Sequence, residues 1–467
     1  MNSLKKGVLM RKGQYLNRLE EIFLAGVERV DPYRLIINHV SLDDARLKIH
    51  TEEYQQNVDL ATYQKIYVVG AGKATAKMAK AFEDILGARI TAGVISVKYG
   101  HTDNLKKIKI VEAGHPIPDD NGIRAAREIA ALARQADEKT LVISLISGGG
   151  SALTPFPYEC ETGKKKIALS LKEKQETTKI LLECGAIINE INCVRKHLSQ
   201  IKGGRLAQML YPATSYNFIL SDVIGDNLDT IASGPTTFDN TTFQDTQEIV
   251  GKYDIKEKLP LKVQETFKLG LAGKIPETPK SGDVVFKRVH NILVGTNLIS
   301  LKAARKKAES LGYKTVILSS QIIGEAKEVA KVLCGIAKDI KRYELLAKRP
   351  VCLIAGGETT VTLIGRGKGG RNQEIALSFL AEIEKNPADT EGIDFLSAST
   401  DGNDGPTDAA GAFASNEILE SALKENLSVN EYLKNNDSYH FFDKIGYLLK
   451  TGPTNTNVCD IHIILIK

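Results

Sequence analysis

Short apolar runs that end in glycine turns and continue into helical patterns constrain the fold of this chain most strongly. The run KIYVV at 65–69 leads into the turn GAGKAT and then into AKMAKAFEDIL, whose apolar residues recur at helical spacing. A strand, a glycine turn and a helix in this order begin a βαβ unit. The same alternation returns from Ile292 onward, and it predicts mostly parallel sheets covered by helices on both faces.

The length of the chain predicts more than one domain, because 467 residues exceed what a single core usually organises. The segment 239–285 is charged and rich in proline, which is typical of a connection. We therefore expect an α/β fold of two domains, a Rossmann-like one over residues 1–240 and a C-terminal one over 241–467. Before the first strand, apolar residues at helical spacing predict helices over 14–60.

Composition narrows the class of protein. Hydrophobic residues make up 42% and charged residues 25% of the chain, which is typical of a globular enzyme. The net charge of +5 is not gathered into basic runs interleaved with aromatics, so a nucleic-acid platform is disfavoured. No apolar run approaches the roughly 18 residues that a membrane helix needs. The six cysteines form no CxxC pair, which predicts reduced thiols and a cytoplasmic protein. The basic segment 1–19 leaves a targeting role open.

Three familiar motifs fail on particular residues. A Walker A loop would need a glycine where Tyr67 stands. A dinucleotide fingerprint would need a third glycine at Thr75 and an acid about 20 residues later, where the chain has SVK. The run that starts at Asp401 would need an oxygen ligand in place of Gly405 and a glutamate in place of Ala412 to be a calcium loop. These differences argue against a P-loop enzyme, a dehydrogenase and an EF-hand protein.

Polar residues follow the predicted strands of the first half at their ends, where open α/β sheets bind ligands. Lys73 lies in the turn after the first strand, where it either binds an anion or begins a surface helix. The turn SGGGS at 147–151 offers backbone N–H groups to a phosphate or a carboxylate, unless it is merely a flexible loop. Asp222 ends a further strand and can bind Mg²⁺, accept a proton or cap the next helix. His115 is either catalytic or packed in a rigid loop.

The second half holds a basic glycine loop, GRGKGGRNQE at 365–374, which follows an apolar strand and the segment GGET at 356–359. Its three cations and unhindered backbone suit a phosphate, although a solvated hairpin has the same composition. Cationic residues around Arg195 and in KGGR at 202–205 allow the same two interpretations, an anion site or a solvated face. Asp401 ends its strand as Asp222 does in the first half.

Taken together, these motifs resemble the glycerate 2-kinase family, whose C-terminal part is called the MOFRL domain. The matching stretches cover the chain from about residue 65 to its end in the order of the family: GAGKA, KYGH, EAGHPIPD, SGGGSAL, INCVRKHLSQIKGGRLA, SDVIGD, SGPT, GGETTV, GRGKGGRNQE, TDGNDGPTDAAGA, NDSY and KTGPTNTNV. The resemblance implies a smaller C-terminal domain that includes the MOFRL region at about 350–467, and an active site in the cleft between the two domains.

The resemblance also implies an activity, the ATP-dependent phosphorylation of D-glycerate to 2-phospho-D-glycerate. ATP is then the co-substrate, and Mg²⁺ is the divalent cation expected with it. We expect small-molecule partners only, D-glycerate and ATP, with no nucleic acid and no membrane. A monomer or a homodimer is expected.

The same resemblance assigns expected roles to residues. Lys73 and Arg371 are expected to contact the transferring phosphoryl group, and Asp222 to act as general base or metal ligand. Glu358 and Asp401 are expected to be further metal ligands. Contacts to the substrate carboxylate or to phosphates are expected from a larger set: Ser147, Gly148, Gly149, Gly150, Ser151, Arg195, Gly356, Gly357 and Asn372.

Three alternatives stay open at this point. An NAD(P)-dependent hydroxypyruvate reductase would use the GAG turn, although no acid is placed to hold a ribose. A module that senses a sugar or a nucleotide is disfavoured by the acids at strand ends in both halves. Phosphorylation at C3 of glycerate, the reaction of a glycerate 3-kinase, differs in regiochemistry alone, and only the resemblance speaks for C2.

Overall fold

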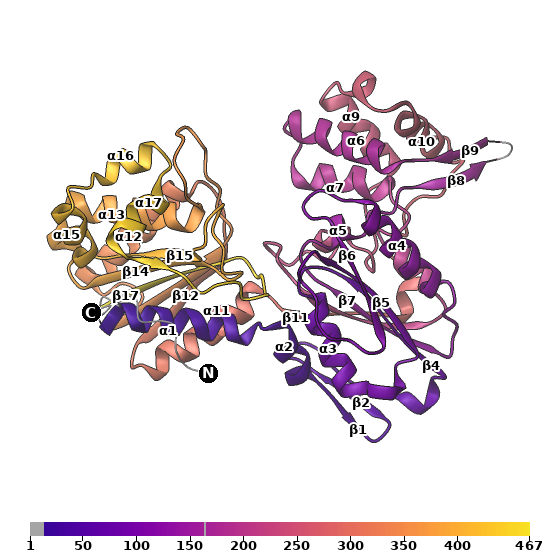
Figure 1. Cartoon of the computed structure of the whole chain (residues 1–467), viewed down its shortest axis with the longest axis horizontal. Helices are drawn as coiled ribbons and strands as arrows, with labels where there is room; N and C mark the ends of the chain where they lie inside the picture. The colour runs from indigo at the N-terminus through magenta and orange to yellow at the C-terminus, as the bar shows by residue number, and fades with distance from the viewer. Residues whose placement is uncertain (1–13, 163–164) are drawn as a thin grey trace. The chain divides into compact units, whose positions relative to one another are not determined.

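Residues 14–162 and 165–467 are described by the structure, a computed structural model (Figure 1). They form two compact units. The central unit is Pro32–Gly295, and the terminal unit joins the described residues up to Asp31 to Thr296–Lys467. Each unit holds a six-stranded sheet with helices on its faces, so the predicted α/β fold class is confirmed. Most of the basic N-terminal segment, 1–13, lies outside the described residues.

The division into units differs from the predicted boundary between residues 240 and 241. The following segment stays in the central unit because it supplies α9 (Phe243–Lys252), α10 (Leu261–Leu271) and β11 (Val289–Gly295). The first two helices pack in a buried core of that unit, and β11 extends its sheet. Prolines and charges at 239–285 therefore mark the surface of packed helices and not a linker.

The central sheet is fully parallel, in the order β11-β10-β7-β4-β5-β6. Its other strands are β4 (Lys65–Ala71), β5 (Ala92–Lys98), β6 (Ile108–Ala113), β7 (Thr140–Ile146) and β10 (Thr214–Leu220). The chain runs outward from β4 to β6 and then returns to β7 on the other side of β4. Strand order therefore reverses between β4 and β7, and this switch point is where open α/β sheets bind ligands.

Helices cover both faces of the central sheet. On one face, α4 (Asp120–Ala133) and α8 (Arg205–Leu210) share a core with Tyr67, Val69 and Val142. On the other face, α3 (Thr75–Leu86) packs through Phe82, whose ring centroid lies 4.8 Å from that of Phe218. Strand residues alternate between these two faces, which explains why the strands are apolar throughout.

The remaining parts of the central unit flank this sheet. Residues 40–59 form an antiparallel three-stranded sheet, so the prediction of helices over all of 14–60 is wrong beyond His39. Short strands alternate buried and exposed residues there, a period that a helical interpretation overlooked. The other elements are α2 (Pro32–His39), β1 (Val40–Asp43), β2 (Arg46–His50), β3 (Gln55–Asp59), η1 (Leu60–Thr62), η2 (Gly87–Arg89), α5 (Gly150–Leu153), β8 (Glu159–Thr162), β9 (Lys165–Ala168), α6 (Leu171–Glu183), α7 (Ile188–His197), η3 (Ile231–Ser233), η4 (Lys256–Lys258) and η5 (Val284–Arg288).

Four helices of the central unit form a group with its own core. Figure 1 shows α6, α7, α9 and α10 clustered beside the β8–β9 hairpin. Leu181, Val194, Phe243 and Phe267 meet in this core. α6 begins at a capping box in which Ser170 and Glu173 exchange hydrogen bonds with each other's backbone, so its start is defined locally.

The terminal sheet is mixed, in the order β12-β13-β17-β14-β15-β16. Only the β12–β13 pair is parallel, so the expectation of a mostly parallel sheet is wrong for this unit. The reason is that β17 returns from the C-terminus and inserts antiparallel between β13 and β14, while β14 to β16 are neighbours in order along the chain. The strands are β12 (Lys314–Ile322), β13 (Val351–Gly357), β14 (Ile393–Ser399), β15 (Gly411–Ala414), β16 (Leu448–Leu449) and β17 (Asp460–Ile466).

Helices from both ends of the chain cover the terminal sheet. Figure 1 shows α1 and α11 on one side of this sheet and α12 and α13 on the other. The helices are α1 (Gln14–Arg29), α11 (Asn297–Ser310), α12 (Ala326–Tyr343), α13 (Arg371–Lys385), α14 (Pro387–Thr390), α15 (Asn416–Lys424), α16 (Val429–Lys434) and α17 (Ser438–Ile445). Nowhere in 14–162 or 165–467 is a helix both long enough and apolar enough to cross a membrane.

Candidate active site

The turns after β4 and β7 interlock at the switch point of the central sheet. The backbone N–H of Lys73 donates to the carbonyl of Gly148 at 2.9 Å, and Ser147 N–H donates to Ala71 O at 3.1 Å. The Ser147 hydroxyl accepts a hydrogen bond from Ala74 N–H at 3.1 Å. The Ser147 side chain therefore joins the two turns. It is buried and exposes little surface to a ligand.

The glycines of the SGGGS turn permit close approach of chemically active side chains. A Cβ atom built on Gly148 would lie 1.9 Å from Oδ2 of Asp222, so this carboxylate lies directly over the turn. A Cβ built on Gly149 would lie 2.9 Å from Cδ2 of His115 and 3.4 Å from Cε of Lys73. Lys73, His115 and Asp222 thus converge on two adjacent glycines. The sequence placed Lys73 and Asp222 at strand ends, and the structure brings both to the same turn.

Burial makes His115 a neutral group. Desolvation is the main cause that lowers the pKa of His115 to about 4, and the neighbouring Lys73 ammonium lowers this pKa further. At pH 7 the imidazole therefore carries no charge. The second histidine beside this turn, His101, donates from its Nδ1–H group to the Lys73 carbonyl, with 3.1 Å between Nδ1 and the oxygen.

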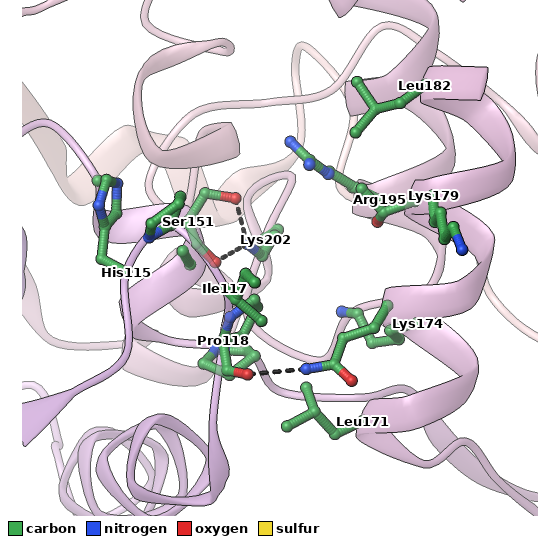
Figure 2. Close-up of a pocket in the computed structure, with 16 residues that line it drawn as sticks. His115, Ile117, Pro118, Ser151, Leu171, Lys174, Lys179, Leu182, Arg195 and Lys202 are labelled. Carbon is green, nitrogen blue, oxygen red and sulfur yellow. Dashed lines mark hydrogen bonds between the residues drawn. The ribbon is translucent and has the colours of Figure 1, made fainter. Parts of the chain in front are cut away.

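A pocket of about 720 Å³ opens next to this turn. Its walls come from the segment 115–118, from the start of α5 and from one face of α6 (Figure 2). The side-chain amide of Gln175 on α6 donates to the Pro118 carbonyl at 2.8 Å, which ties two walls together. Residues of α6 line the pocket at helical spacing: Leu171, Lys174, Gln175, Thr178, Lys179 and Leu182. We call this cavity the α6 pocket.

Three cations surround the interior of the α6 pocket. Figure 2 shows Lys174, Arg195 and Lys202 around one space, with Lys202 hydrogen-bonded to Ser151. The Lys174 ammonium is buried and has no hydrogen-bond partner within residues 14–162 and 165–467. Burial, with smaller contributions from Arg195 and Arg205, lowers the pKa of Lys174 to about 7. Burial and the other two cations also lower the pKa of Lys202 well below its usual range.

The cationic segments around Arg195 and at 202–205 split into two kinds of residue. Lys196 and Arg205 are buried structural groups: Lys196 pairs with Asp239 at 3.3 Å, and the Arg205 guanidinium lies 4.8 Å from the Tyr158 ring centroid. Arg195 and Lys202 instead line the pocket. The alternative interpretation of these segments as a solvated helix face is therefore wrong for Lys196, Lys202 and Arg205, because all three are buried.

The basic glycine loop of the terminal unit places Arg371 among carboxylates. Nε of Arg371 donates to Asp460 at 2.6 Å and Nη1 to Glu358 at 2.6 Å. Although burial opposes it, the paired Asp460 carboxylate holds the pKa of Arg371 above its ordinary value. Since the Asp460 side chain is fully buried, this ion pair is part of the unit's structure. The predicted role of Arg371 at the phosphoryl group stays a prediction.

The other expected residues of the terminal unit have internal partners. Asn372 is buried, and its amide and backbone N–H groups donate to Asp404. Gly356 is packed so closely that a Cβ would lie 2.0 Å from the Asn297 side-chain oxygen. Oδ1 of Asp401 accepts hydrogen bonds from the Ser399 hydroxyl and Asn403 N–H, both at 2.9 Å. The register Gly357–Asp460–Ser399 brings Glu358, Asp460 and Asp401 to the same edge of the sheet.

The arrangement of the described side chains gives limited support for a bound metal ion. Among the residues that the structure describes, no group of three or more His, Cys, Asp and Glu side chains could hold a metal ion. Mg²⁺, however, is commonly held by one or two carboxylates together with the phosphates of its substrate. The residues present therefore fit a Mg²⁺ that arrives with a phosphate ligand, and Asp222 beside the glycine turn is the carboxylate best placed for it.

Lys174 was not among the residues predicted from the sequence to form the site. In the helix LKEKQETTK it is one of several lysines and glutamates on a polar surface, and its neighbour Lys172 is exposed. The Lys174 side chain is buried by tertiary packing, in which α6 contacts α7 and α10. Lys202 was part of the KGGR segment, but its difference from Arg205 depends equally on tertiary contacts.

Fold and site together define a doubly wound α/β protein with a glycine turn and a pocket lined by cationic side chains at the switch point of its central sheet. Residues 18–268 match the family described as a domain of unknown function, DUF4147, and residues 351–460 match the MOFRL family. The chain is 42% identical to the glycerate 2-kinase of Pyrococcus horikoshii, over 94% of each chain. It is 41% identical to the D-glycerate 2-kinase of Thermotoga maritima, over 86% of this chain and 91% of that protein.

A solved structure supports the same relationship. A crystal structure of a Pyrococcus horikoshii protein is 39% identical, covers 98% of this chain and 100% of its own, and has a TM-score of 0.83. The protein therefore belongs to the glycerate kinase family, a family of kinases, as the motifs predicted.

Proposed function

We propose that this protein transfers the γ-phosphoryl group of ATP to the 2-hydroxyl of D-glycerate, giving 2-phospho-D-glycerate and ADP. The observation that carries the proposal is the convergence of Lys73 and Asp222 on the glycine turn beside a cationic pocket. Relatives named glycerate 2-kinase and D-glycerate 2-kinase, at 42% and 41% identity, support the acceptor and its position. A hydroxypyruvate reductase has no such support from named relatives.

Each proposed residue has a physical task in the reaction. The substrate hydroxyl oxygen attacks the γ-phosphorus, its proton passes to the Asp222 carboxylate, and the bond to the ADP oxygen breaks. Lys73 offsets the negative charge that moves onto the leaving phosphate oxygens. Backbone N–H groups of the SGGGS turn, with Ser151, contact the substrate carboxylate or the phosphates.

The metal proposed for the reaction is Mg²⁺, and metal ligand is the alternative role of Asp222 to that of general base. When bound, the ion would neutralise charge on phosphate oxygens. Glu358 and Asp401 are weaker candidates, because Glu358 already pairs with Arg371 and Asp401 accepts two hydrogen bonds. Arg371 keeps its proposed place as a second cation for the phosphoryl group.

Product analysis tests the reaction directly. The protein would be incubated with ATP, Mg²⁺ and D-glycerate, and the product identified by ³¹P NMR against 2- and 3-phosphoglycerate standards. A 3-phosphate product would overturn the regiochemistry. Oxidation of NADH with hydroxypyruvate, followed at about 340 nm, would instead favour a reductase, and we expect none.

Single substitutions test the assigned roles. Lys73→Ala is expected to lower kcat at least ~10²-fold, because a cation at the transition state is lost. Asp222→Asn is expected to be nearly inactive and still folded. Lys80→Ala is the control. Lys80 lies on α3, the helix that follows the turn of Lys73, and is ion-paired with Asp84 at the surface. Near-normal kcat in Lys73→Ala or Asp222→Asn removes that residue from the mechanism.

A further inference from the structure

We propose that the α6 pocket binds the phosphate chain of the nucleoside triphosphate, with Lys174, Lys202 and Arg195 as its cationic contacts. In this arrangement the base lies against the apolar rim of the pocket, formed by Ile117, Leu171 and Leu182. The inference rests on the proposed kinase activity and decides which of its two substrates occupies this cavity.

The charge of the pocket indicates a ligand with several negative charges. Among the residues that the structure describes, Lys174 has no hydrogen-bond partner, and Lys202 bonds to the neutral oxygens of Ser151. None of the described residues that line the pocket is an aspartate or a glutamate. Burying ammonium groups without counter-charge is costly, so the cluster is stable as cations only when an anion fills the space. Glycerate carries a single carboxylate, whereas a triphosphate matches three cations.

The charged groups that lower the pKa of Lys174 are basic. Arg195 on α7 and Arg205 on α8 act on its pKa, and Lys202 lies in the same cluster. Arg205 is occupied elsewhere, since it donates to the Lys196 and Ser199 carbonyls. Lys179 also lines the pocket, but it is exposed and lies 3.7 Å from Glu183. Lys174, Lys202 and Arg195 are therefore the cations that we assign to a ligand in this pocket.

The dimensions and rim of the pocket also suit a nucleotide. A volume of about 720 Å³ falls in the range that holds drug-sized ligands, of about 300–1,000 Å³, and exceeds the needs of a three-carbon acid. Ile117 and Leu182 on opposite walls leave 71% and 60% of their surfaces exposed, which an aromatic base can cover. Figure 2 shows the segment 115–118 on one side and α6 on the other, with Arg195 reaching between them.

The direction of the ligand follows from the glycine turn. Gly149 lines the α6 pocket and also faces the Lys73 side chain. A phosphate chain held by Lys202 and Lys174 therefore has its outer end available to Lys73. This places the transferring phosphoryl group beside Asp222 and the base at the α6 rim.

Nucleotide binding without turnover tests the proposal. ATP would be titrated calorimetrically, without D-glycerate, into the full-length protein and into Lys174→Met, Lys202→Met and Lys172→Met. We expect Lys174→Met and Lys202→Met each to raise the Kd for ATP about 10- to 100-fold, the usual effect of losing a charged hydrogen bond. Lys172→Met, an exposed lysine on the same helix, is expected to bind ATP normally. Unchanged ATP affinity in Lys174→Met overturns the proposal.

A second readout separates the two substrates. In steady-state assays, Lys174→Met is expected to raise KM for ATP and to leave KM for D-glycerate unchanged. An increase in KM for D-glycerate with normal ATP binding would assign the pocket to the acid and overturn the inference. If the wild-type protein binds ATP through Lys174 but does not phosphorylate D-glycerate, the proposed function fails while this inference stands.

Proton uptake gives a signature that a merely structural lysine would not show. Lys174 in the empty pocket has a pKa of about 7, and phosphate oxygens favour its charged form. At pH 8, ATP binding is therefore expected to take up a proton, measured as a difference in heat between buffers of unlike ionisation enthalpy. Lys174→Met is expected to show a smaller uptake, because Lys202 still gains a proton, and to remain folded, because the substitution removes an unpaired buried charge. The same proton uptake in Lys174→Met would overturn the assignment to Lys174.

Discussion

Gly149 shows how one residue can couple backbone conformation to the site. Its φ of 83° lies in the left-handed region, and a Cβ there would collide with the His115 ring. Gly185 has nearly the same φ of 79° but nothing within 4 Å of a built Cβ. The two positions therefore share the backbone strain and differ in the collision alone.

Substitution of these two glycines by alanine separates strain from collision. Gly149→Ala is expected to displace His115 and Lys73 and to lower kcat more than ~10-fold, since small misplacements at a site are costly. Gly185→Ala is expected to cost about 1–2 kcal/mol of stability with kcat unchanged. Steady-state kinetics and thermal melts of both variants provide the comparison. Equal kcat in the two variants would mean that the packing over Gly149 has no part in the reaction.

The ion pair of Arg371 makes its mutation ambiguous unless stability is measured as well. Arg371→Ala leaves the buried Asp460 carboxylate unpaired, and we expect a loss of about 3–5 kcal/mol in unfolding free energy. The double variant Arg371→Met with Asp460→Asn is expected to recover much of this stability. If the proposed contact to the phosphoryl group holds, its kcat stays at least ~10²-fold low. Full activity in the double variant would mean that Arg371 has only a structural role. Arg366→Ala, at an exposed position of the same loop, serves as the control.

At the scale of elements, the first helix belongs with the end of the chain. α1 contributes Leu19, Ile22 and Phe23 to the core of the terminal unit, where they pack with β13, β14 and β17. The N-terminal part of the sequence thus stabilises a sheet whose strands begin more than 280 residues later along the chain.

Truncation of one α1 side chain tests this assignment. Phe23→Ala is expected to destabilise the terminal unit by about 3–5 kcal/mol, because Phe23 is fully buried. Hydrogen exchange is expected to speed up in β13, β14 and β17 and to stay unchanged in β4 and β7. Leu24→Ala, at the adjacent position with 41% of its surface exposed, is the matched control. Faster exchange in the central sheet instead would contradict the division into units.

At the scale of the whole molecule, buried histidines make stability depend on pH. Burial lowers the pKa of His115 and of His462 to about 4, so both are neutral in the folded protein. The unfolded chain protonates each near pH 6.5 and therefore binds more protons between pH 4 and 6.5. Stability from these two groups falls as pH decreases through this window. Asp404 acts in the opposite sense, because burial raises its pKa to about 7.

The contribution of His462 to stability can be measured from the slope of unfolding free energy against pH. His462→Asn is expected to remove about 1.4 kcal/mol per pH unit from the dependence of unfolding free energy on pH between 4 and 6.5. Urea unfolding at several pH values in this window measures the slope. An unchanged slope in His462→Asn would mean that this histidine is charged in the folded state.

Much of this molecule could be predicted because the relevant signals are local. An apolar run followed by a glycine turn specifies a strand and its end within about ten residues, so Lys73, the SGGGS turn and Asp222 were placed at strand ends from sequence. Their common edge followed from the parallel arrangement of the central sheet. Motifs in a fixed order also indicated the glycerate kinase family, which the relatives confirm.

Tertiary structure alone decided what depends on residues far apart in the chain. The insertion of β17 between β13 and β14 made the terminal sheet mixed. Residues 14–31 pack in the terminal unit, so the first helix lies outside the predicted N-terminal domain. Arg371 and Asp460 pair across 89 positions of sequence. Desolvation of Lys174 likewise arises from the packing of α6 and not from its neighbours in sequence. Periodicity and turn chemistry act over one or two turns of chain, whereas burial and charge pairing are set by which distant surfaces meet.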